Sequence, residues 1–227
     1  MAPSIIRLAL ADDHTLFTRI LSNYLSQQKN LKVILETGNA SDLLLKLKET
    51  PVDVILLDLF MPKMNSIDAI KTINDDYPKI KIIVLSICTD LNIISNLLDI
   101  GIHAYLSKNE EPHKLVEAIS SASQNRLYRN DLYTAALFLN KENSIKKSDF
   151  APKTILNERE KQIIQLLWEE KSNKEISQRV FLSVRSVEKI RQDIKEKLEF
   201  KSIAGLFRYA LEQGIITVPF ELSKANI

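Results

Sequence analysis

Short apolar runs alternate with segments of helical periodicity through the first half of the chain. Each run leads into a polar or charged residue. Between the runs, apolar residues recur every three or four positions, as on the buried face of an amphipathic helix. Alternating strands and helices are typical of an α/β fold, a doubly wound parallel sheet covered by helices on both faces. We therefore predict five parallel strands. The strand-like runs identified are residues 5–10, 52–57, 82–85 and 104–106, and the stripes expected to face the core are Leu16, Ile20, Leu21 and Leu25; Leu43, Leu44 and Leu47; Ile67, Ile70 and Ile73; and Leu115, Val116 and Ile119.

Beyond residue 153 the apolar spacing is helical throughout. Asn157, followed three residues later by Glu160, has the form of a capping box. A short helix over 173–180, a tight turn and a longer helix over 184–199 follow, which is the helix-turn-helix layout. A fourth amphipathic helix ends this small all-α domain, and its apolar face either packs internally or pairs two copies of the domain. That face consists of Ile203, Leu206, Phe207, Ala210 and Leu211.

The change of pattern predicts two domains. We assign residues 1–124 to the α/β domain, 125–153 to a polar and partly helical linker, 154–220 to the four-helix domain and 221–227 to a tail. Residues 1–120 carry 12 Lys/Arg and 15 Asp/Glu, a net charge of −3, whereas residues 121–153 carry 6 and 3, a net charge of +3. An acidic part joined to a more basic part favours a sensor coupled to a nucleic-acid-binding domain.

Charged side chains stand at the ends of the predicted strands. Asp12 and Asp13 follow the first strand, Asp58 follows the run 52–57, and Lys108 follows the last run. The carboxyl ends of parallel strands meet at one edge of a sheet, where α/β proteins bind ligands. Three carboxylates lying so near one another repel unless a cation joins them. Mg²⁺ is suited to this place because it binds hard oxygen ligands and phosphate. The pattern predicts a magnesium-dependent site at which the Asp58 carboxylate accepts a phosphoryl group, stabilised by Lys108.

The longer helix of the all-α domain has a polar outer face. At 100° per residue, Arg185, Lys189, Gln192 and Glu196 lie opposite the apolar stripe. Cations and an amide at the start of such a helix suit phosphates and base edges in the major groove of double-stranded DNA, with Glu196 turned away from it.

The composition narrows the class of protein further. Cys88 is the only cysteine, so no disulfide forms within the chain, and no apolar run is long enough to span a membrane. A cytoplasmic protein is therefore expected. The three histidines show no ligand spacing with one another or with Cys88, so no transition-metal site is predicted.

These motifs together resemble a known family. The chain is similar to response regulators of bacterial two-component signalling of the NarL/FixJ class, which join a flavodoxin-like receiver domain to a LuxR-type helix-turn-helix domain. The resemblance covers nearly the whole chain. The matching receiver segments are Ala11-Asp12-Asp13-His14, Leu57-Asp58-Leu59-Phe60-Met61-Pro62, Val84-Leu85-Ser86 and Tyr105-Leu106-Ser107-Lys108; the matching LuxR-type segments are Leu156-Asn157-Glu158-Arg159-Glu160, Ser172-Asn173-Lys174-Glu175-Ile176, Leu182-Ser183-Val184-Arg185-Ser186-Val187-Glu188 and Lys197-Leu198.

The resemblance implies a role for each matched residue. It makes Asp58 the phosphorylated residue, receiving the phosphoryl group from a sensor histidine kinase or a phosphotransfer protein. It implies a switch in which Ser86 moves toward the phosphoryl group while the ring of Tyr105 changes position; a simple packing role for Tyr105 stays equally open. It implies a homodimer when the protein is phosphorylated or bound to DNA. The implied Mg²⁺ ligands are Asp12 (through water), Asp13, Asp58 and the backbone carbonyl of Phe60, and the implied DNA-binding residues are Lys174, Arg185, Ser186, Lys189 and Gln192.

Two other classes of function are weighed against this interpretation. A phosphatase with an aspartyl nucleophile needs a second acid two residues after the nucleophile, and Phe60 stands there, so an enzyme is not expected. An atypical regulator, whose receiver only dimerises, is disfavoured by the complete acidic site. The sequence departs from the family's pattern with Ser66 and Glu170 where glycine is frequent, and with Asn109 where proline often follows the lysine.

Overall fold

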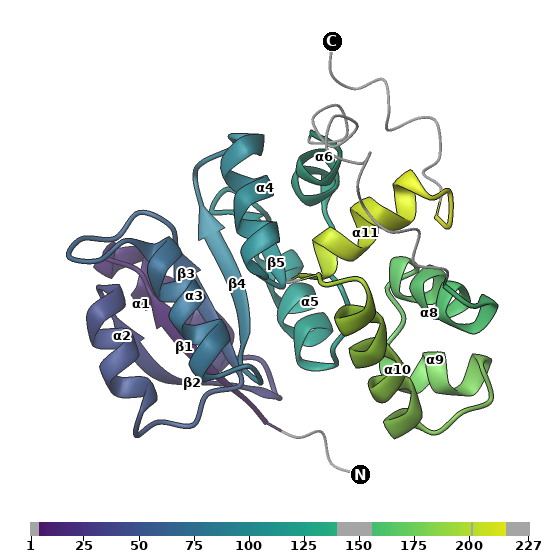
Figure 1. The fold of residues 1–227 in the computed structure, drawn as a ribbon. Helices are drawn as coiled ribbons and strands as arrows, with labels where there is room; N and C mark the ends of the chain where they lie inside the picture. The colour runs from purple at the N-terminus through teal and green to yellow at the C-terminus, as the bar shows by residue number, and fades with distance from the viewer. Residues whose placement is uncertain (1–4, 140–155, 201, 217–227) are drawn as a thin grey trace.

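A computed structural model describes residues 5–139, 156–200 and 202–216. The first part is an α/β domain whose five strands form one parallel sheet in the order β2-β1-β3-β4-β5 (Figure 1). The strand order reverses beside β1, so the crevice at the carboxyl ends of β1 and β3 is the position where doubly wound sheets bind ligands. The strands are β1 (Ile6–Ala11), β2 (Leu31–Thr37), β3 (Val54–Asp58), β4 (Lys81–Ser86) and β5 (Ala104–Ser107).

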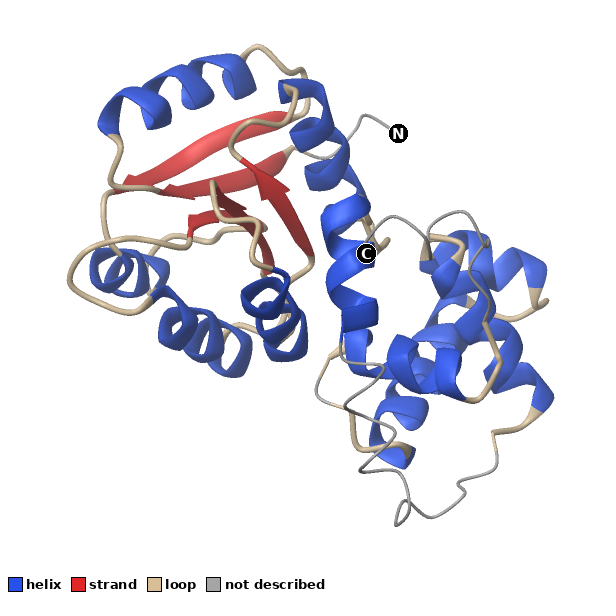
Figure 2. Cartoon of the chain, turned by 90° about the horizontal axis from the view of Figure 1, so that it is seen from above, coloured by secondary structure: helices blue, strands red, loops and turns tan. Residues whose placement is uncertain are grey.

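Helices cover both faces of the sheet (Figure 2). Side chains alternate between the faces of a strand, so Leu8 and Leu56 belong to one apolar cluster while Ile55 and Leu57 belong to the other. Both clusters are buried, which explains why the strands read as continuous apolar runs. The five helices of this domain are α1 (Thr15–Ser26), α2 (Ala40–Leu47), α3 (Ser66–Asp76), α4 (Leu91–Ile100) and α5 (Pro112–Ser123).

The remaining helices lie beside the sheet (Figure 2): the last four form a bundle, whereas the first packs mainly on the α/β domain. Side-chain caps set their first residues: Asn157 and Glu160 form a capping box, Ser172 forms a second one with Glu175, and Ser183 accepts from the Ser186 amide. Capping satisfies amides that have no partner within the helix. The helices are α6 (Asp131–Leu139), α8 (Glu158–Trp168), α9 (Asn173–Arg179), α10 (Val184–Lys197) and α11 (Ile203–Glu212).

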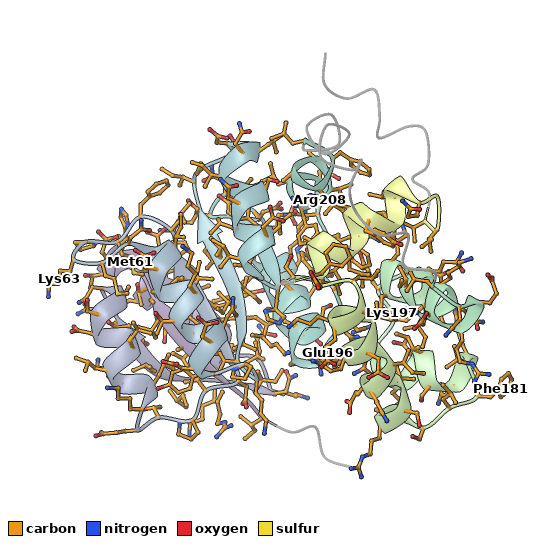
Figure 3. All side chains as sticks on the ribbon, in the orientation of Figure 1. Met61, Lys63, Phe181, Glu196, Lys197 and Arg208 are labelled. Atoms are coloured by element: carbon orange, nitrogen blue, oxygen red, sulfur yellow. The ribbon has the colours of Figure 1, made fainter. Side chains whose placement is uncertain are left out.

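The two halves are packed against each other along α4. Helix α6 packs on α4 and β5, and α11 packs on α4, α6 and α8. Figure 3 shows Arg208 of α11 at this seam, where its guanidinium pairs with the Asp99 carboxylate and donates to the Ser95 hydroxyl (2.7 Å). Behind the seam, the rings of Trp168 and Phe207 meet edge to face at 5.2 Å. We call these contacts of Arg208 the α4–α11 seam.

A second link joins the segment after α5 to α8. The Arg129 guanidinium lies over the Trp168 ring (3.9 Å) and donates to the Trp168 carbonyl (2.6 Å) and to the Glu170 carboxylate (3.1 Å). Glu170 has a left-handed backbone, with φ of 59°. Glycine adopts this conformation freely, and a residue with a Cβ is strained there by roughly 1–2 kcal/mol. The ion pair with Arg129 compensates for part of that strain.

Several sequence-based expectations are corrected by the structure. The stripe of α1 is not all core, because Leu16 and Ile20 are 73% and 62% exposed. Strand β2 and helix α4 are present where no apolar run or stripe was identified. The domain boundaries at 124 and 153 stay predictions, and the linker beyond 139 and the tail 221–227 lie outside the described residues. No helix among the described residues is long and apolar enough to cross a membrane.

Candidate functional site

The acidic residues predicted at the strand ends come together at one edge of the sheet. Carboxylate oxygens of Asp12, Asp13 and Asp58 and a ring nitrogen of His14 all lie within 4.8 Å of one another. Asp58 is the last residue of β3 and is 3% exposed, and Asp12 is also buried, whereas Asp13 and His14 face solvent. The site is therefore a crevice with two buried carboxylates at its base and two accessible groups at its mouth.

Lys108 neutralises the two buried carboxylates. Its ammonium lies 2.8 Å from Asp12 Oδ2 and 3.1 Å from Asp58 Oδ2. The ammonium also lies 5.1 Å from the centre of the Phe17 ring, whose face attracts cations. One cation for two close carboxylates leaves negative charge in the crevice. Asp12 Oδ2 has no hydrogen bond of good geometry within the described part of the chain. A further cation fits this set of donors.

The electrostatics of Asp58 are dominated by its burial. Burial raises the pKa of the Asp58 carboxyl, and the negative charge of Asp12 raises it further. Lys108 and the backbone amide of Phe60 oppose the rise by stabilising the charged form. A divalent cation in the crevice would act in the same direction as Lys108.

Local hydrogen bonds fix the backbone around these carboxylates. The Ser66 hydroxyl, almost fully buried, donates to the Asp58 backbone carbonyl at 3.1 Å. Ser66 thus ties the first turn of α3 to the end of β3, which gives a structural role to a position where glycine is frequent. The His14 amide donates to Asp12 Oδ1 (2.9 Å), and the His14 ring nitrogen lies 3.0 Å from Asp13 Oδ1.

Ser86 and Tyr105 lie on neighbouring strands beside this crevice. Ser86 is fully buried and its hydroxyl accepts from the Cys88 amide at 3.2 Å. It does not cap α4, because Asp90 is the N-cap residue of that helix. The Tyr105 side chain is also fully buried, with its hydroxyl donating to the Cys88 carbonyl at 2.6 Å, and burial raises its pKa to about 12. Both side chains therefore contact the β4–α4 loop.

The predicted DNA-binding residues lie on the outside of the C-terminal bundle. Arg185, Lys189 and Gln192 of α10 and Lys174 of α9 are exposed. Ser186 is partly exposed, and its hydroxyl lies 2.8 Å from that of Ser183. Gln192 donates to the Glu196 carboxylate at 2.6 Å. Phe181, in the turn before α10, is 92% exposed and points away from the bundle (Figure 3).

Comparisons with known proteins identify the class of this molecule. Residues 8–120 match the family model of the response regulator receiver domain, and residues 154–210 match that of the bacterial regulatory proteins of the luxR family. The chain belongs to the two-component response regulators, in which a receiver domain is joined to a LuxR-type DNA-binding domain. It is accordingly a DNA-binding transcriptional regulator of a two-component system, and not an enzyme.

Particular relatives cover the whole architecture. The chain is 30% identical over 215 residues to the oxygen regulatory protein NreC of Staphylococcus aureus (strain JH9), covering 93% of this chain and 99% of that protein. The NreC protein of Staphylococcus haemolyticus (strain JCSC1435) is 29% identical over 215 residues, with the same coverage. Among solved structures, the RcsB response regulator of Salmonella typhimurium matches with a TM-score of 0.56 at 22% identity, over 92% of this chain and 99% of that chain. This last match shows that the two chains share a fold.

Sequence reasoning missed several residues that the structure brings to the site and to the seam. His14 and Phe17 border the acidic crevice, yet neither lies at a strand end, so the strand-end pattern gave no sign of them. Asp99 and Arg208 are 109 residues apart in sequence. A single arginine in a sequence carries no signal of a distant partner, so no pattern in the chain indicated this pair.

Proposed function

We propose that Asp58 is the phosphoacceptor of this regulator. The observation that carries this proposal is the placement of Asp58 at the end of β3, with the Lys108 ammonium 3.1 Å from its carboxylate. An oxygen of Asp58 attacks the phosphorus of a phosphohistidine on a sensor kinase or phosphotransfer protein. The new P–O bond forms as the P–N bond breaks, and the histidine nitrogen leaves with the electron pair. Lys108 faces the position where charge accumulates on the phosphoryl oxygens.

Magnesium is the cation proposed for the crevice. The carboxylates of Asp13 and Asp58 and the backbone carbonyl of Phe60 would hold it directly, and Asp12 would act through water. These donors are all hard oxygens, which suit Mg²⁺. When bound, Mg²⁺ neutralises charge on the carboxylates and on the phosphoryl group, so Asp58 is held as the reactive carboxylate despite its burial.

The switch proposed for the receiver involves Ser86 and Tyr105. A phosphoryl group on Asp58 attracts the Ser86 hydroxyl, which then no longer accepts from the Cys88 amide. Tyr105 donates to the carbonyl of the same residue, Cys88. Movement of Ser86 therefore disturbs the loop that leads into α4, the helix on which α11 packs.

Release of the DNA-binding half is the proposed output of this switch. Arg208 holds α11 on α4 through Asp99 and Ser95. A shift of α4 weakens these contacts, so the bundle separates from the receiver. The surface of α11 that packs on α4 is then free to pair two copies of the chain. A dimer presents two recognition helices, as two half-sites of double-stranded DNA require. The regulator acts in the cytoplasm, where its kinase partner and DNA are available.

Helix α10 is proposed as the recognition helix. Arg185, Lys189 and Gln192 are exposed along it, and Ser186 and the α9 residue Lys174 border the same face. Long cationic and amide side chains reach phosphates and base edges from such a helix. Glu196 binds the Gln192 amide in the free protein, which holds Gln192 in place before DNA is bound.

Phosphorylation-dependent DNA binding tests this proposal. The protein is treated with acetyl phosphate and Mg²⁺, and its affinity for a DNA fragment selected from a random library by the treated wild type is measured by fluorescence anisotropy. We expect treatment to raise affinity and to shift the wild type toward a dimer in size-exclusion chromatography, with no change for Asp58→Asn. Equal affinity with and without treatment would remove phosphorylation from the mechanism and favour a regulator controlled by partner binding.

A further inference from the structure

A large cavity lies between the receiver and the recognition helix. Its volume is about 1060 Å³, and its walls come from α3, α4 and β4 on one side and from α10 on the other. Ligand pockets in proteins measure roughly 300–1,000 Å³, so this one has room for a small organic molecule. None of the acidic-site residues lines it. It is thus separate from the phosphoacceptor crevice, and it exists only while the two halves are docked.

Cations from both domains line this cavity. Lys81 of β4 and Arg126 after α5 belong to the receiver side, and Arg191 and Lys195 belong to α10. Lys81 has no ion pair or hydrogen bond to its ammonium within the described residues. Arg191 contacts the amide oxygen of Asn173 rather than a carboxylate. Glu188 attracts Arg191 and Glu175 attracts Arg126, but neither forms an ion pair with its arginine among the described residues, so the positive charge of the cavity is only partly compensated.

Burial makes the remaining positive charge costly. The Nε of Arg126 is buried and has no hydrogen-bond partner among the described residues. Burial lowers the pKa of Lys81, and the charge of Arg191 lowers it further. The pKa of His103, on the same wall, falls to about 3 through burial, with Lys81 and Arg191 adding to the shift, so His103 is neutral there. Lys81 and Arg191 are both partly buried, and an anion between them would stabilise the charged forms of both.

The acidic residues of the cavity fill this role only in part, because the charge of Glu188 favours charged Arg191 but no carboxylate among the described residues pairs with Lys81 or Arg191. Asp99 pairs with Arg208 in the α4–α11 seam, and Glu188 accepts from the side-chain amide of Asn173 at 3.3 Å. Asp75, the third, is exposed. Arg191 occupies the inner side of α10, next to the buried Val187 and Ile194, so it does not belong to the DNA-facing row of that helix.

We infer that this cavity binds the phosphate group of a small phosphorylated ligand, which bridges Lys81 of the receiver and Arg191 of the recognition helix. Guanidinium and ammonium groups are the usual protein ligands of phosphate. Because the two cations come from different domains, the ligand stabilises the docked state and is absent from the separated one. Ligand binding therefore opposes DNA binding. By linkage, the ligand lowers the affinity for DNA by at most the factor by which it favours the docked state. Free inorganic phosphate and a nucleotide offer the same chemistry, and they are distinguished by the test.

The test uses the full-length chain carrying Asp58→Asn, in EDTA, so that neither phosphotransfer nor a divalent cation contributes. Isothermal titration calorimetry is run with ATP, pyrophosphate, inorganic phosphate and adenosine at constant ionic strength. We expect one site per chain for at least one phosphate probe, and none for adenosine. Tighter binding of ATP than of inorganic phosphate would identify a nucleotide as the ligand class, and equal binding would identify free phosphate.

Three further variants locate the site. Lys81→Gln and Arg191→Gln each remove one of the bridging charges. We expect each to lower the affinity for the phosphate probe at least tenfold. Lys79→Gln is the matched control, because Lys79 is exposed and lies outside the cavity. Circular dichroism checks that each variant is folded. If Arg191→Gln does not fold, Lys81→Gln alone tests the site. The inference is overturned if no phosphate probe binds, or if Lys81→Gln binds it as tightly as Lys79→Gln does.

Discussion

Arg208 offers the sharpest test of how the two halves communicate. Its guanidinium is only 14% exposed and makes three polar contacts: two across the α4–α11 seam, with the Asp99 carboxylate and the Ser95 hydroxyl (2.7 Å), and one with the Leu137 carbonyl of α6 (3.4 Å). Arg208→Gln removes the charge and shortens the side chain. If the seam holds the DNA-binding half on the receiver, this change favours separation without phosphorylation.

The size of the effect follows from these contacts. Asp99 is 43% exposed, so its ion pair is screened by solvent and stabilises by about 0.2–1 kcal/mol. Each hydrogen bond from the buried guanidinium contributes roughly 1.5 kcal/mol, less for the long contact with Leu137. A total of about 2 kcal/mol corresponds to an increase of roughly 30-fold in the ratio of separated to docked molecules. The affinity for DNA should therefore rise by at most the same factor of roughly 30.

Two measurements on unphosphorylated protein check this prediction. Small-angle X-ray scattering gives the radius of gyration, which should rise in Arg208→Gln, and fluorescence anisotropy gives affinity for the selected DNA, which should rise also. Arg7→Gln is the matched control, because Arg7 forms an ion pair of 2.8 Å with Asp53 inside the receiver, away from the seam. Wild-type values of both quantities in folded Arg208→Gln would refute the role of the seam.

Three other predictions concern the acidic site, the recognition helix and the link through Glu170. Asp58 has a folded-state pKa raised above its ordinary value of 3.8, so metal-free protein gains stability as pH falls through the raised pKa toward 3.8 and loses it as pH rises again. Asp58→Asn should therefore unfold at a higher temperature than wild type at neutral pH without metal, with the difference shrinking toward acid pH; a constant difference would contradict the burial argument. Arg185→Ala and Lys189→Ala should each weaken specific DNA binding by about 1–3 kcal/mol if they contact base edges, whereas equal loss on every sequence, measured by anisotropy on selected and scrambled DNA, would assign the residue to phosphate contacts. Glu170→Gly relieves a left-handed backbone strain of roughly 1–2 kcal/mol but removes the ion pair with Arg129. Its free energy of unfolding, measured with urea, should therefore stay within about 1 kcal/mol of wild type. Glu170→Ala keeps the strain and loses the ion pair, so it should be clearly less stable.

The acidic site was predictable because it depends on strand ends. Asp12, Asp58 and Lys108 each follow an apolar run, and parallel strands bring their carboxyl ends together. The capping box of Asn157 and Glu160 was equally visible, since capping is local in sequence. In both cases a short pattern determines the geometry: the structure brings Asp12, Asp58 and Lys108 together and forms the capping box, while the roles of the three site residues stay predictions.

Other features depend on contacts that no local pattern encodes. Helical spacing shows which face of α1 is apolar, but not how much of that face the sheet covers, so Leu16 and Ile20 were wrongly assigned to the core. The position of Arg191 on the inner side of α10 follows from spacing, yet its burial depends on how the receiver docks. Tyr105 is a similar case, because either a packing role or a switch role suits an aromatic residue on β5.

The most direct test of Asp58 as phosphoacceptor is intact-mass measurement after incubation with acetyl phosphate and Mg²⁺, followed by peptide mapping. The prediction is one phosphoryl group per wild-type chain, located on Asp58, and none on Asp58→Asn. Omitting Mg²⁺ should abolish the gain in wild type. A wild type that gains no phosphoryl group, or an Asp58→Asn variant that gains one as readily, would contradict the assignment of Asp58 and its magnesium site.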